Sequence, residues 1–196
     1  MSRIPLERQR LDIPNADPYV DGLPLVLVTV GMDHQPFHRL MRWVDAWLKA
    51  GAAARVRCLL QTGPAIQPAL AECRDFLGFA ELEAAIRSAT VVACHAGPGS
   101  IMMCRWNRQR PVVVPRLARY GEVVDDHQVT FARRLAAGGH IQLAEDEGTF
   151  LALMEAALTA QASERPGNDG LEVTEPLRRF EALIDDMVRS RRGGRR

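Results

Sequence analysis

Several features are scarce or missing in this sequence, and each absence excludes a class of protein. Lys49 is the only lysine, and all other basic residues are arginines. The 25 basic and 24 acidic residues leave a net charge of +1, so no overall field favours nucleic acid as a partner. No CxxC pair occurs, and the cysteines lie in or beside apolar segments. We therefore expect free core thiols, not disulfides or a zinc site, at Cys58, Cys73, Cys94 and Cys104.

Long hydrophobic runs are also missing. The longest apolar stretches, such as residues 23–30, are far shorter than the roughly 18 residues that a membrane-spanning helix needs. The N-terminus is polar, contains prolines, and lacks the apolar centre of a signal peptide. These absences predict a cytoplasmic protein. The 47% of hydrophobic and 25% of charged residues are typical of a globular chain.

The composition divides the chain into four parts. Residues 1–22 combine prolines and charges without periodicity, which predicts an N-terminal arm. The predicted domain covers residues 23–160, and the Pro- and Gly-containing stretch 161–175 has the composition of a linker. Residues 176–196 predict a basic amphipathic helix and tail. Such a helix suits either a solvated end or a contact with a membrane surface or partner.

Within the domain, short apolar runs alternate with segments of helical period. Strands without in/out alternation, each followed by a helix, are typical of a parallel sheet covered on both faces. The prediction is an α/β fold, a Rossmann-like doubly wound parallel sheet. The expected strands are 25–30, 54–60, a short one around 76–77, 90–94, 111–114 and 140–143, and the expected helices are 37–48, 82–88, 100–107, 126–137 and 147–160.

Ligands of such sheets bind beyond the carboxyl ends of the strands. One loop there reads His95-Ala96-Gly97-Pro98-Gly99-Ser100, leaving a strand and entering a helix. Its glycines permit close backbone approach, and Ser100 is placed to cap a helix whose free amides would face a phosphate. A purely steric need for glycine explains the pattern equally well. Because Met102 stands where the dinucleotide fingerprint needs its third glycine, an NAD-dependent enzyme is not expected.

A second loop, residues 116–124, runs into Asp125-Asp126-His127-Gln128 at the start of a predicted helix. The two aspartates suit capping of that helix, and His127 and Gln128 would point toward the glycine loop.

A metal site that combines this segment with His95 is the rival interpretation. The spacing matches no common ligand template, so we predict no metal site. His34 and His38 are expected at the surface, with Pro36 between them.

Several ordered segments together resemble a known family, the C-terminal domain of family 28 glycosyltransferases. They are VTVGMDHQPFHRLMRWVD, QTG, FLGFAELEAAIRSATVVACHAGPGSIM and RPVVVPRLARYGEVVDDHQVTFARRLAAGG. The likeness extends from residue 25 to about residue 150. It is greatest to stand-alone forms of this domain, namely the catalytic subunit of two-part UDP-GlcNAc transferases and PssE-like exopolysaccharide subunits.

The resemblance implies the donor-binding half of a GT-B glycosyltransferase, which binds a UDP-sugar and needs neither metal nor cofactor. Family positions imply that the loop at Phe79 holds the uracil. The loop after the first strand would face the diphosphate and the acceptor through Gly31 and Met32. The helix start would contact the diphosphate through Gly97, Gly99 and Ser100, with His95 beside it, and the donor sugar would lie against His127 and Gln128.

One position departs from the family pattern. The family usually has a glutamate that binds both ribose hydroxyls four residues after the second loop glycine, and this chain has Met103 there. Losing a charge-assisted hydrogen-bond pair of about 1.5 to 3 kcal/mol would weaken nucleotide binding roughly 10- to 100-fold. Either Glu122 or Asp125 substitutes, or the chain binds UDP poorly. If the ribose site is assigned correctly, Met103→Glu should tighten UDP binding.

A GT-B enzyme reacts between two lobes, and this chain has room for only one. The resemblance therefore implies a hexosyltransferase that moves a hexose or N-acetylhexosamine to a lipid-linked acceptor together with a membrane-associated acceptor-binding subunit. That partner would hold the chain at the inner face of the membrane. The general base is left open, with His95 and His34 as candidates. The alternatives are a degenerate nucleotide-sugar-binding or scaffolding module without catalysis, and an unrelated α/β enzyme such as a nucleotide-sugar epimerase.

Overall fold

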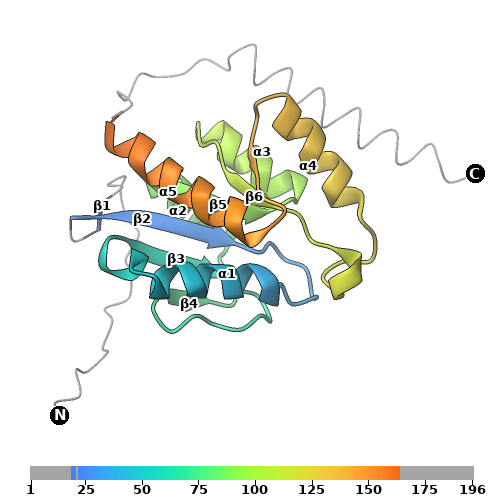
Figure 1. Ribbon diagram of the computed structural model, residues 1–196, viewed down its shortest axis with the longest axis horizontal. Helices are drawn as coiled ribbons and strands as arrows, with labels where there is room; N and C mark the ends of the chain where they lie inside the picture. The colour runs from blue at the N-terminus through green and yellow to red at the C-terminus, as the bar shows by residue number, and fades with distance from the viewer. Residues whose placement is uncertain (1–18, 21, 164–196) are drawn as a thin grey trace, which may run out of the picture.

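The computed structural model describes residues 19, 20 and 22–163, in which strands and helices alternate (Figure 1). The strands are β1 Tyr19–Val20, β2 Leu23–Thr29, β3 Arg57–Gln61, β4 Glu72–Arg74, β5 Val91–His95, β6 Val112–Val114 and β7 Gln142–Leu143. The helices are α1 His38–Lys49, α2 Phe79–Ser88, α3 Pro98–Trp106, α4 His127–Ala137 and α5 Glu147–Ser163, with 3-10 turns at Ala52–Ala54 and Ala118–Tyr120.

Six of the strands form a parallel sheet in the order β4-β3-β2-β5-β6-β7, and β1 pairs antiparallel with β2. The central strand β2 aligns Thr29 with Gln61 of β3 on one side and with Cys94 of β5 on the other. From β2 the chain builds outward to β3 and β4, then crosses back to β5 and builds outward in the other direction. This topology confirms the predicted Rossmann-like doubly wound sheet.

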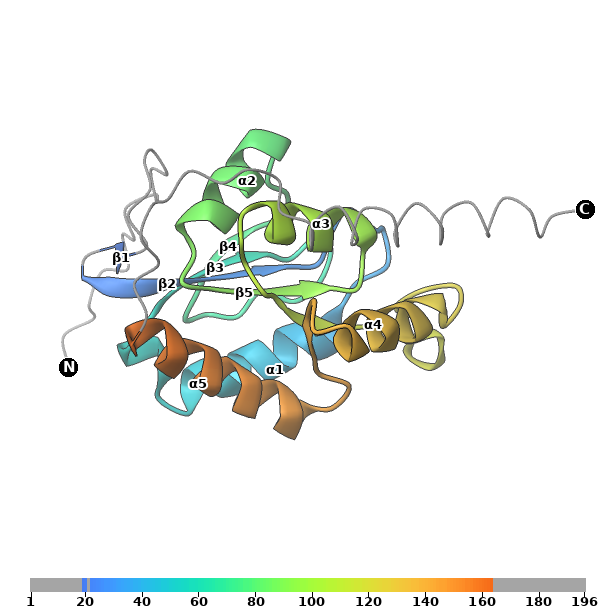
Figure 2. The same ribbon diagram turned by 90° about the horizontal axis from the view of Figure 1, so that it is seen from above.

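Alternate residues of each central strand face opposite helical layers. In β2, Val26 and Val28 pack in a cluster with buried residues of α1 and α5, whereas Leu25 and Leu27 pack with residues of α2 and α3. A third cluster joins β5 and β6 to α3 and α4. Figure 2 shows α1 and α5 on one side of the sheet and α2 and α3 on the other. Because both faces are covered, the middle of each central strand is apolar on both sides, as the sequence indicated, and polar residues such as Thr29, Gln61 and His95 stand at the carboxyl ends.

One predicted strand is misplaced, and a predicted cap is wrong. The strand expected around 76–77 lies instead at Glu72–Arg74, an edge strand whose side chains are half-buried and whose Arg74 pairs with Glu72. An edge strand faces solvent along one side, so charged residues are accommodated there and no apolar run is required. Helix α3 begins at Pro98 with Gly97 as its N-cap, so Ser100 lies inside the first turn and does not cap the helix.

The cysteines are free, as expected: Cys58, Cys94 and Cys104 are buried and Cys73 is half-buried. No helix of the described residues has the length and apolar character needed to cross a membrane.

Parts of the predicted domain organisation lie outside the described residues. This applies to the predicted basic helix 176–196, to the linker 161–175 beyond the last three residues of α5, and to all of the predicted arm except Tyr19, Val20 and Gly22.

Candidate functional site

Strands β2 and β5 lie side by side at the point where the sheet changes its direction of winding. The loops that follow these two strands leave the carboxyl edge of the sheet in opposite directions, one toward α1 and the other toward α3. Ligands of open α/β sheets bind at such a switch point. The predicted site residues of both loops therefore meet where the fold class expects a ligand.

The turn after β2 is held by two side chains that the sequence analysis did not single out. The Thr29 hydroxyl donates to Gln61 Oε1 at 2.7 Å and accepts the Gly31 amide at 3.2 Å, and Gln61 Nε2 donates to the Gly31 carbonyl at 3.2 Å. Thr29 and Gln61 are buried. Gly31 has φ +78°, a left-handed conformation that favours glycine. The backbone amide and the carbonyl group of Gly31 are thus both fixed in place.

The imidazole of His95, the last residue of β5, lies between two glycines. A Cβ atom on Gly31 would lie 2.3 Å from His95 Cε1, and a Cβ on Gly97 would lie 2.1 Å from His95 Nε2. No side chain other than hydrogen fits at either position unless the ring moves. Gly31 and Gly97 are therefore required by the histidine that they enclose, which is the steric explanation that the sequence left open; it does not apply to Gly99.

The electrostatic surroundings of His95 keep its ring neutral. Burial is the main cause that lowers its pKa to about 4, and the nearby Arg116 guanidinium lowers it further, while Asp33 and a hydrogen bond to the Thr29 backbone act in the opposite direction. Its Nδ1 atom is buried and makes no hydrogen bond to any residue that the structure describes. At neutral pH the ring carries one N–H donor and one acceptor.

Helix α3 starts directly after this histidine. Pro98 occupies its first turn, Gly97 is the N-cap, and no side chain of the described residues caps the helix. The amides of Gly99 and Ser100 belong to the first turn and have no carbonyl partner within the helix. A Cβ on Gly99 would have no atom within 4 Å, so this part of the turn is open. An uncapped helix start of this kind attracts anions.

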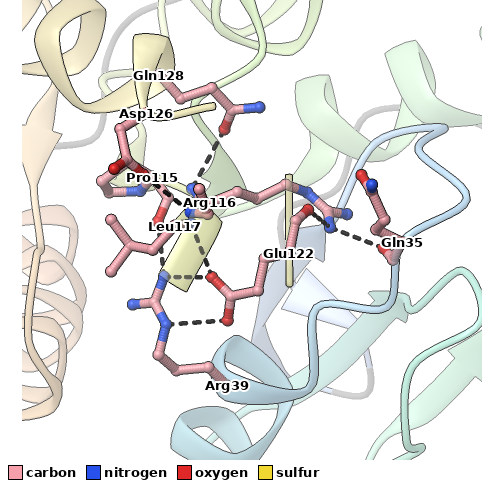
Figure 3. A network of polar contacts seen from close by, with 9 residues as sticks. Gln35, Arg39, Pro115, Arg116, Leu117, Glu122, Asp126 and Gln128 are labelled. Atoms are coloured by element: carbon pink, nitrogen blue, oxygen red, sulfur yellow. Dashed lines mark hydrogen bonds and ion pairs between the residues drawn. The ribbon is translucent and has the colours of Figure 1, made fainter. Parts of the chain in front are cut away.

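A buried network of charged residues ties the loop after β6 to the loop after β2 (Figure 3). Arg116 is fully buried and donates to three carbonyl oxygens: that of Val30 at 2.9 Å, that of Gln35 at 2.7 Å and that of Glu122 at 3.0 Å. Its guanidinium also stacks over the Phe37 ring, 4.7 Å from the centroid. Arg116 thereby holds both ends of the loop that contains Gly31.

Glu122 completes this network. Its carboxylate accepts hydrogen bonds from Arg39 Nε at 3.0 Å and Arg39 Nη2 at 2.8 Å, and from the Leu117 amide at 3.0 Å. Glu122 is only 3% exposed. The suggestion that Glu122 substitutes for the ribose-binding glutamate is therefore wrong, because its oxygens are committed to a buried ion pair.

The residues at the start of α4 have differing environments. Gln128 Oε1 accepts the backbone amide of Arg116 at 3.2 Å, so Gln128 is joined to the same network. His127 is exposed, and its Nδ1 lies 3.2 Å from Asp125 Oδ1. The Asp126 side chain accepts the Ala118 amide and does not cap the helix. Asp125 Oδ1 accepts the backbone amide of His127, the first residue of α4, at 3.0 Å, so Asp125 satisfies a free amide of the helix start as expected, whereas Asp126 orders the loop.

The remaining predicted site residues divide into exposed and buried ones. Met32 is 79% exposed in the loop after β2, and Phe79, the first residue of α2, is 69% exposed. His34 is exposed, as predicted, whereas His38 is half-buried and accepts the Ile66 amide through Nδ1.

Met103 is 7% exposed and packs in the core cluster under α2 and α3. Within the described part of the chain, no three His, Cys, Asp or Glu side chains lie together as a metal site would require.

The model of the glycosyltransferase family 28 C-terminal domain matches residues 25–165. The chain belongs to this family. Two solved glycosyltransferases share its fold. A glycosyltransferase of kitacinnamycin has a TM-score of 0.57 at 19% identity, over 91% of this chain and 43% of its own. The calicheamicin glycosyltransferase CalG4 has a TM-score of 0.55 at 16% identity, over 92% of this chain and 44% of its own. No curated protein matches the sequence.

This family 28 domain therefore has the fold of the C-terminal half of a GT-B glycosyltransferase, and it spans less than half the length of the solved structures that it matches. The structure brings Gly31, His95, Gly97 and the start of α3 together. It adds Thr29, Gln61, Arg39 and Arg116, which position the loops and were not expected from the sequence. The sequence contains one signal that could have pointed to two of these residues: Thr29 and Gln61 are polar residues at the ends of two apolar strands.

Proposed function

We propose that this chain is the UDP-sugar-binding subunit of a glycosyltransferase. The observation that carries the proposal is the placement of His95 between Gly31 and Gly97, beside the uncapped start of α3 at the switch point of the sheet. The diphosphate would accept hydrogen bonds from the amides of Gly99 and Ser100. A neutral His95 would donate its N–H to the same group, which avoids burying an imidazolium.

Glycosyl transfer requires that the leaving UDP be stabilised as negative charge develops on it. Fixed backbone amides and a neutral imidazole provide such stabilisation without a metal ion. The loop after β2 must keep a fixed conformation for this task. Arg116 fixes it by donating to the Val30 and Gln35 carbonyls on either side of Gly31. We further propose that the uracil binds near Phe79, that the donor sugar binds near His127 and Gln128, and that Met32 faces the acceptor.

The acceptor side of the reaction is proposed to come from a second subunit. The chain covers only 43% and 44% of the two solved glycosyltransferases that share its fold, and this partial match supports the proposal of a second, acceptor-binding lobe. We propose that this subunit is membrane-associated, that it presents a lipid-linked acceptor, and that the chain works in the cytoplasm at the inner face of the membrane. The transferred group would be a hexose or an N-acetylhexosamine.

A nucleotide-sugar-binding module without catalysis is the second candidate, and the burial of Met103 favours it. Where the family usually has a ribose-binding glutamate, this side chain packs in the apolar core. A site without that carboxylate would bind the nucleotide through the diphosphate and base alone. Sugar transfer by the chain together with its partner subunit would exclude this candidate.

Calorimetric titration with UDP and then UDP-GlcNAc, with and without magnesium, tests the proposal. We expect binding that does not depend on the metal and that is weakened by His95→Gln. Arg42→Gln is the matched control, because Arg42 is an exposed residue of α1 and should leave the affinity unchanged. Absence of binding, or equal affinity in the His95→Gln variant, would contradict the proposed diphosphate site.

A further inference from the structure

The loop that connects β6 to α4 exposes two large apolar side chains at the carboxyl edge of the sheet (Figure 1). Val124 is 85% exposed, and Tyr120, which ends the 3-10 turn of this loop, is 57% exposed. Single exposed apolar residues are common on proteins, but here they gather at one edge. Of the eight large hydrophobic side chains that are exposed among the described residues, six lie at this edge: Met32, Ile66, Phe76, Phe79, Tyr120 and Val124. The carboxyl edge is therefore the candidate for a contact surface.

A buried ion pair holds this loop from beneath. The Glu122 carboxylate accepts hydrogen bonds from the Leu117 amide and from Arg39. The Arg39 guanidinium also lies over the Tyr120 ring, 5.5 Å from its centroid. Burying an ion pair costs desolvation energy, so it is not expected beneath a loop that only connects a strand to a helix. The exposed apolar side chains thus stand on a loop of fixed conformation.

The need to order the loop after β2 explains only part of this anchoring. Arg116 holds that loop from the same network, which accounts for Arg116 itself. Two further hydrogen bonds lie wholly within the loop after β6: the Leu117 amide donates to Glu122 at 3.0 Å, and the Ala118 amide donates to Asp126 at 2.9 Å. A loop that is already ordered loses less conformational entropy when a partner binds it. The loop after β6 is therefore preorganised for a contact.

The exposed charges beside these apolar side chains are mainly negative. Asp75, Asp125 and Asp126 are exposed on the loops after β4 and β6. Among the described residues of those two loops, Arg119 is the only exposed arginine, and its guanidinium lies over the Tyr120 ring. The carboxylates would repel an anionic lipid surface and would attract a protein face that carries basic groups. The charge therefore favours a protein over a membrane as the occupant.

We propose that residues 117–126, the docking loop, bind a second protein whose docking face presents apolar side chains flanked by basic groups. Tyr120 and Val124 would pack between those apolar side chains, and the exposed aspartates would meet the basic groups. The proposal rests on the proposed function, because it takes this protein to be the acceptor-binding subunit. Docking here would place that subunit beside the Gly31 turn, which Arg116 joins to the docking loop.

Photocross-linking identifies the occupant. In the full chain, benzoylphenylalanine replaces Val124 or, as the matched control, Ala152, which is exposed on α5. Both variants are expressed in the cells from which the gene comes and are then irradiated. We expect position 124 to form an adduct with one protein that position 152 does not form. An adduct with lipid alone, an adduct with a second copy of this chain, or no adduct at position 124 would each overturn the proposal.

Calorimetry with the cross-linked protein, produced separately and purified, then measures the contact. Val124→Arg should weaken its binding to the chain at least about tenfold, because a new cation would enter an apolar contact and face basic groups. Ala152→Arg, the same gain of charge on α5, should bind as the wild type does. Equal affinity of the Val124→Arg variant and the wild type would overturn the docking loop.

Titration with UDP separates this inference from the proposed function. The Val124→Arg variant should bind UDP as the wild type does, because Val124 is not part of the proposed donor site. Loss of UDP binding in this variant would place the loop in the donor site and overturn the docking surface. If the second protein binds through the docking loop but the pair transfers no sugar from UDP-GlcNAc, the proposed function fails and the docking surface stands.

Discussion

At the scale of single residues, the contact between His95 and Gly97 makes a strong prediction. Gly97→Ala should lower the free energy of unfolding by about 1 to 3 kcal/mol, because the new Cβ would overlap the imidazole and the ring has Gly31 on its other side. Gly99→Ala is the matched control for stability, since its Cβ meets no atom within 4 Å. Urea denaturation of both variants measures the difference. Equal stability of the two would mean that the ring moves freely.

The low pKa of His95 predicts a pH dependence of stability. Its pKa falls from 6.5 to about 4 on folding, so the unfolded chain binds the extra proton between these values. The contribution of His95 to the free energy of unfolding, about 3 kcal/mol, is then fully present above pH 6.5 and is lost as the pH falls toward 4. The His95→Gln variant should lack that component when unfolding is measured at pH 7 and pH 4.5. An identical pH dependence in both proteins would contradict the assignment.

Met103 connects stability and binding at one position. Met103→Glu would place a carboxyl group in an apolar cluster where the native side chain is 7% exposed, so we expect a loss of at least about 2 kcal/mol of stability. Met103→Leu is the control for packing alone. If the ribose site is correctly assigned, the same glutamate should tighten UDP binding despite this loss. Thermal denaturation and calorimetry of both variants separate the two effects.

At the scale of secondary-structure elements, the network around Glu122 couples the loops after β2 and β6. Removing one partner of a buried ion pair costs about 3 to 5 kcal/mol, so Glu122→Gln and Arg39→Met should each be strongly destabilising. The double variant should lose much less than the sum of the two. Denaturation of the four proteins gives this coupling energy, and simple additivity would show that the ion pair contributes little.

The elements also show how far the sequence could predict this structure. Apolar runs and helical periods located most of the strands and the five α-helices of residues 22–163, because packing on both faces of a parallel sheet leaves a strong local pattern. Edge strand β4 was missed because an edge strand faces solvent along one side. It therefore contains Glu72 and Arg74 and has no apolar run to mark it in the sequence. The ion pair of Arg39 with Glu122 joins residues 83 positions apart, so only the fold brings them together. The glycine loop was located correctly, but the role of its glycines depended on where the His95 ring lies.

At the scale of the whole molecule, the chain provides one half of a GT-B architecture. We expect the purified chain to bind UDP-sugar but to transfer almost no sugar, since the proposed acceptor lobe is on another subunit. Release of UDP from UDP-GlcNAc, measured with and without that subunit, tests this expectation. Robust transfer by the chain alone would contradict the two-subunit arrangement, whereas failure of the pair to transfer would favour the non-catalytic module.

The position of Lys49 has a practical consequence for such measurements. This lysine is exposed at the end of α1, and α1 runs from the carboxyl edge of the sheet back to its amino edge. Apart from the α-amino group, it is the only primary amine of the chain. Amine coupling to a sensor surface through Lys49 would therefore attach the protein by the edge away from His95. The loops proposed to meet the nucleotide and the partner would face the solution, whereas amine-directed cross-linkers would leave those loops unlabelled.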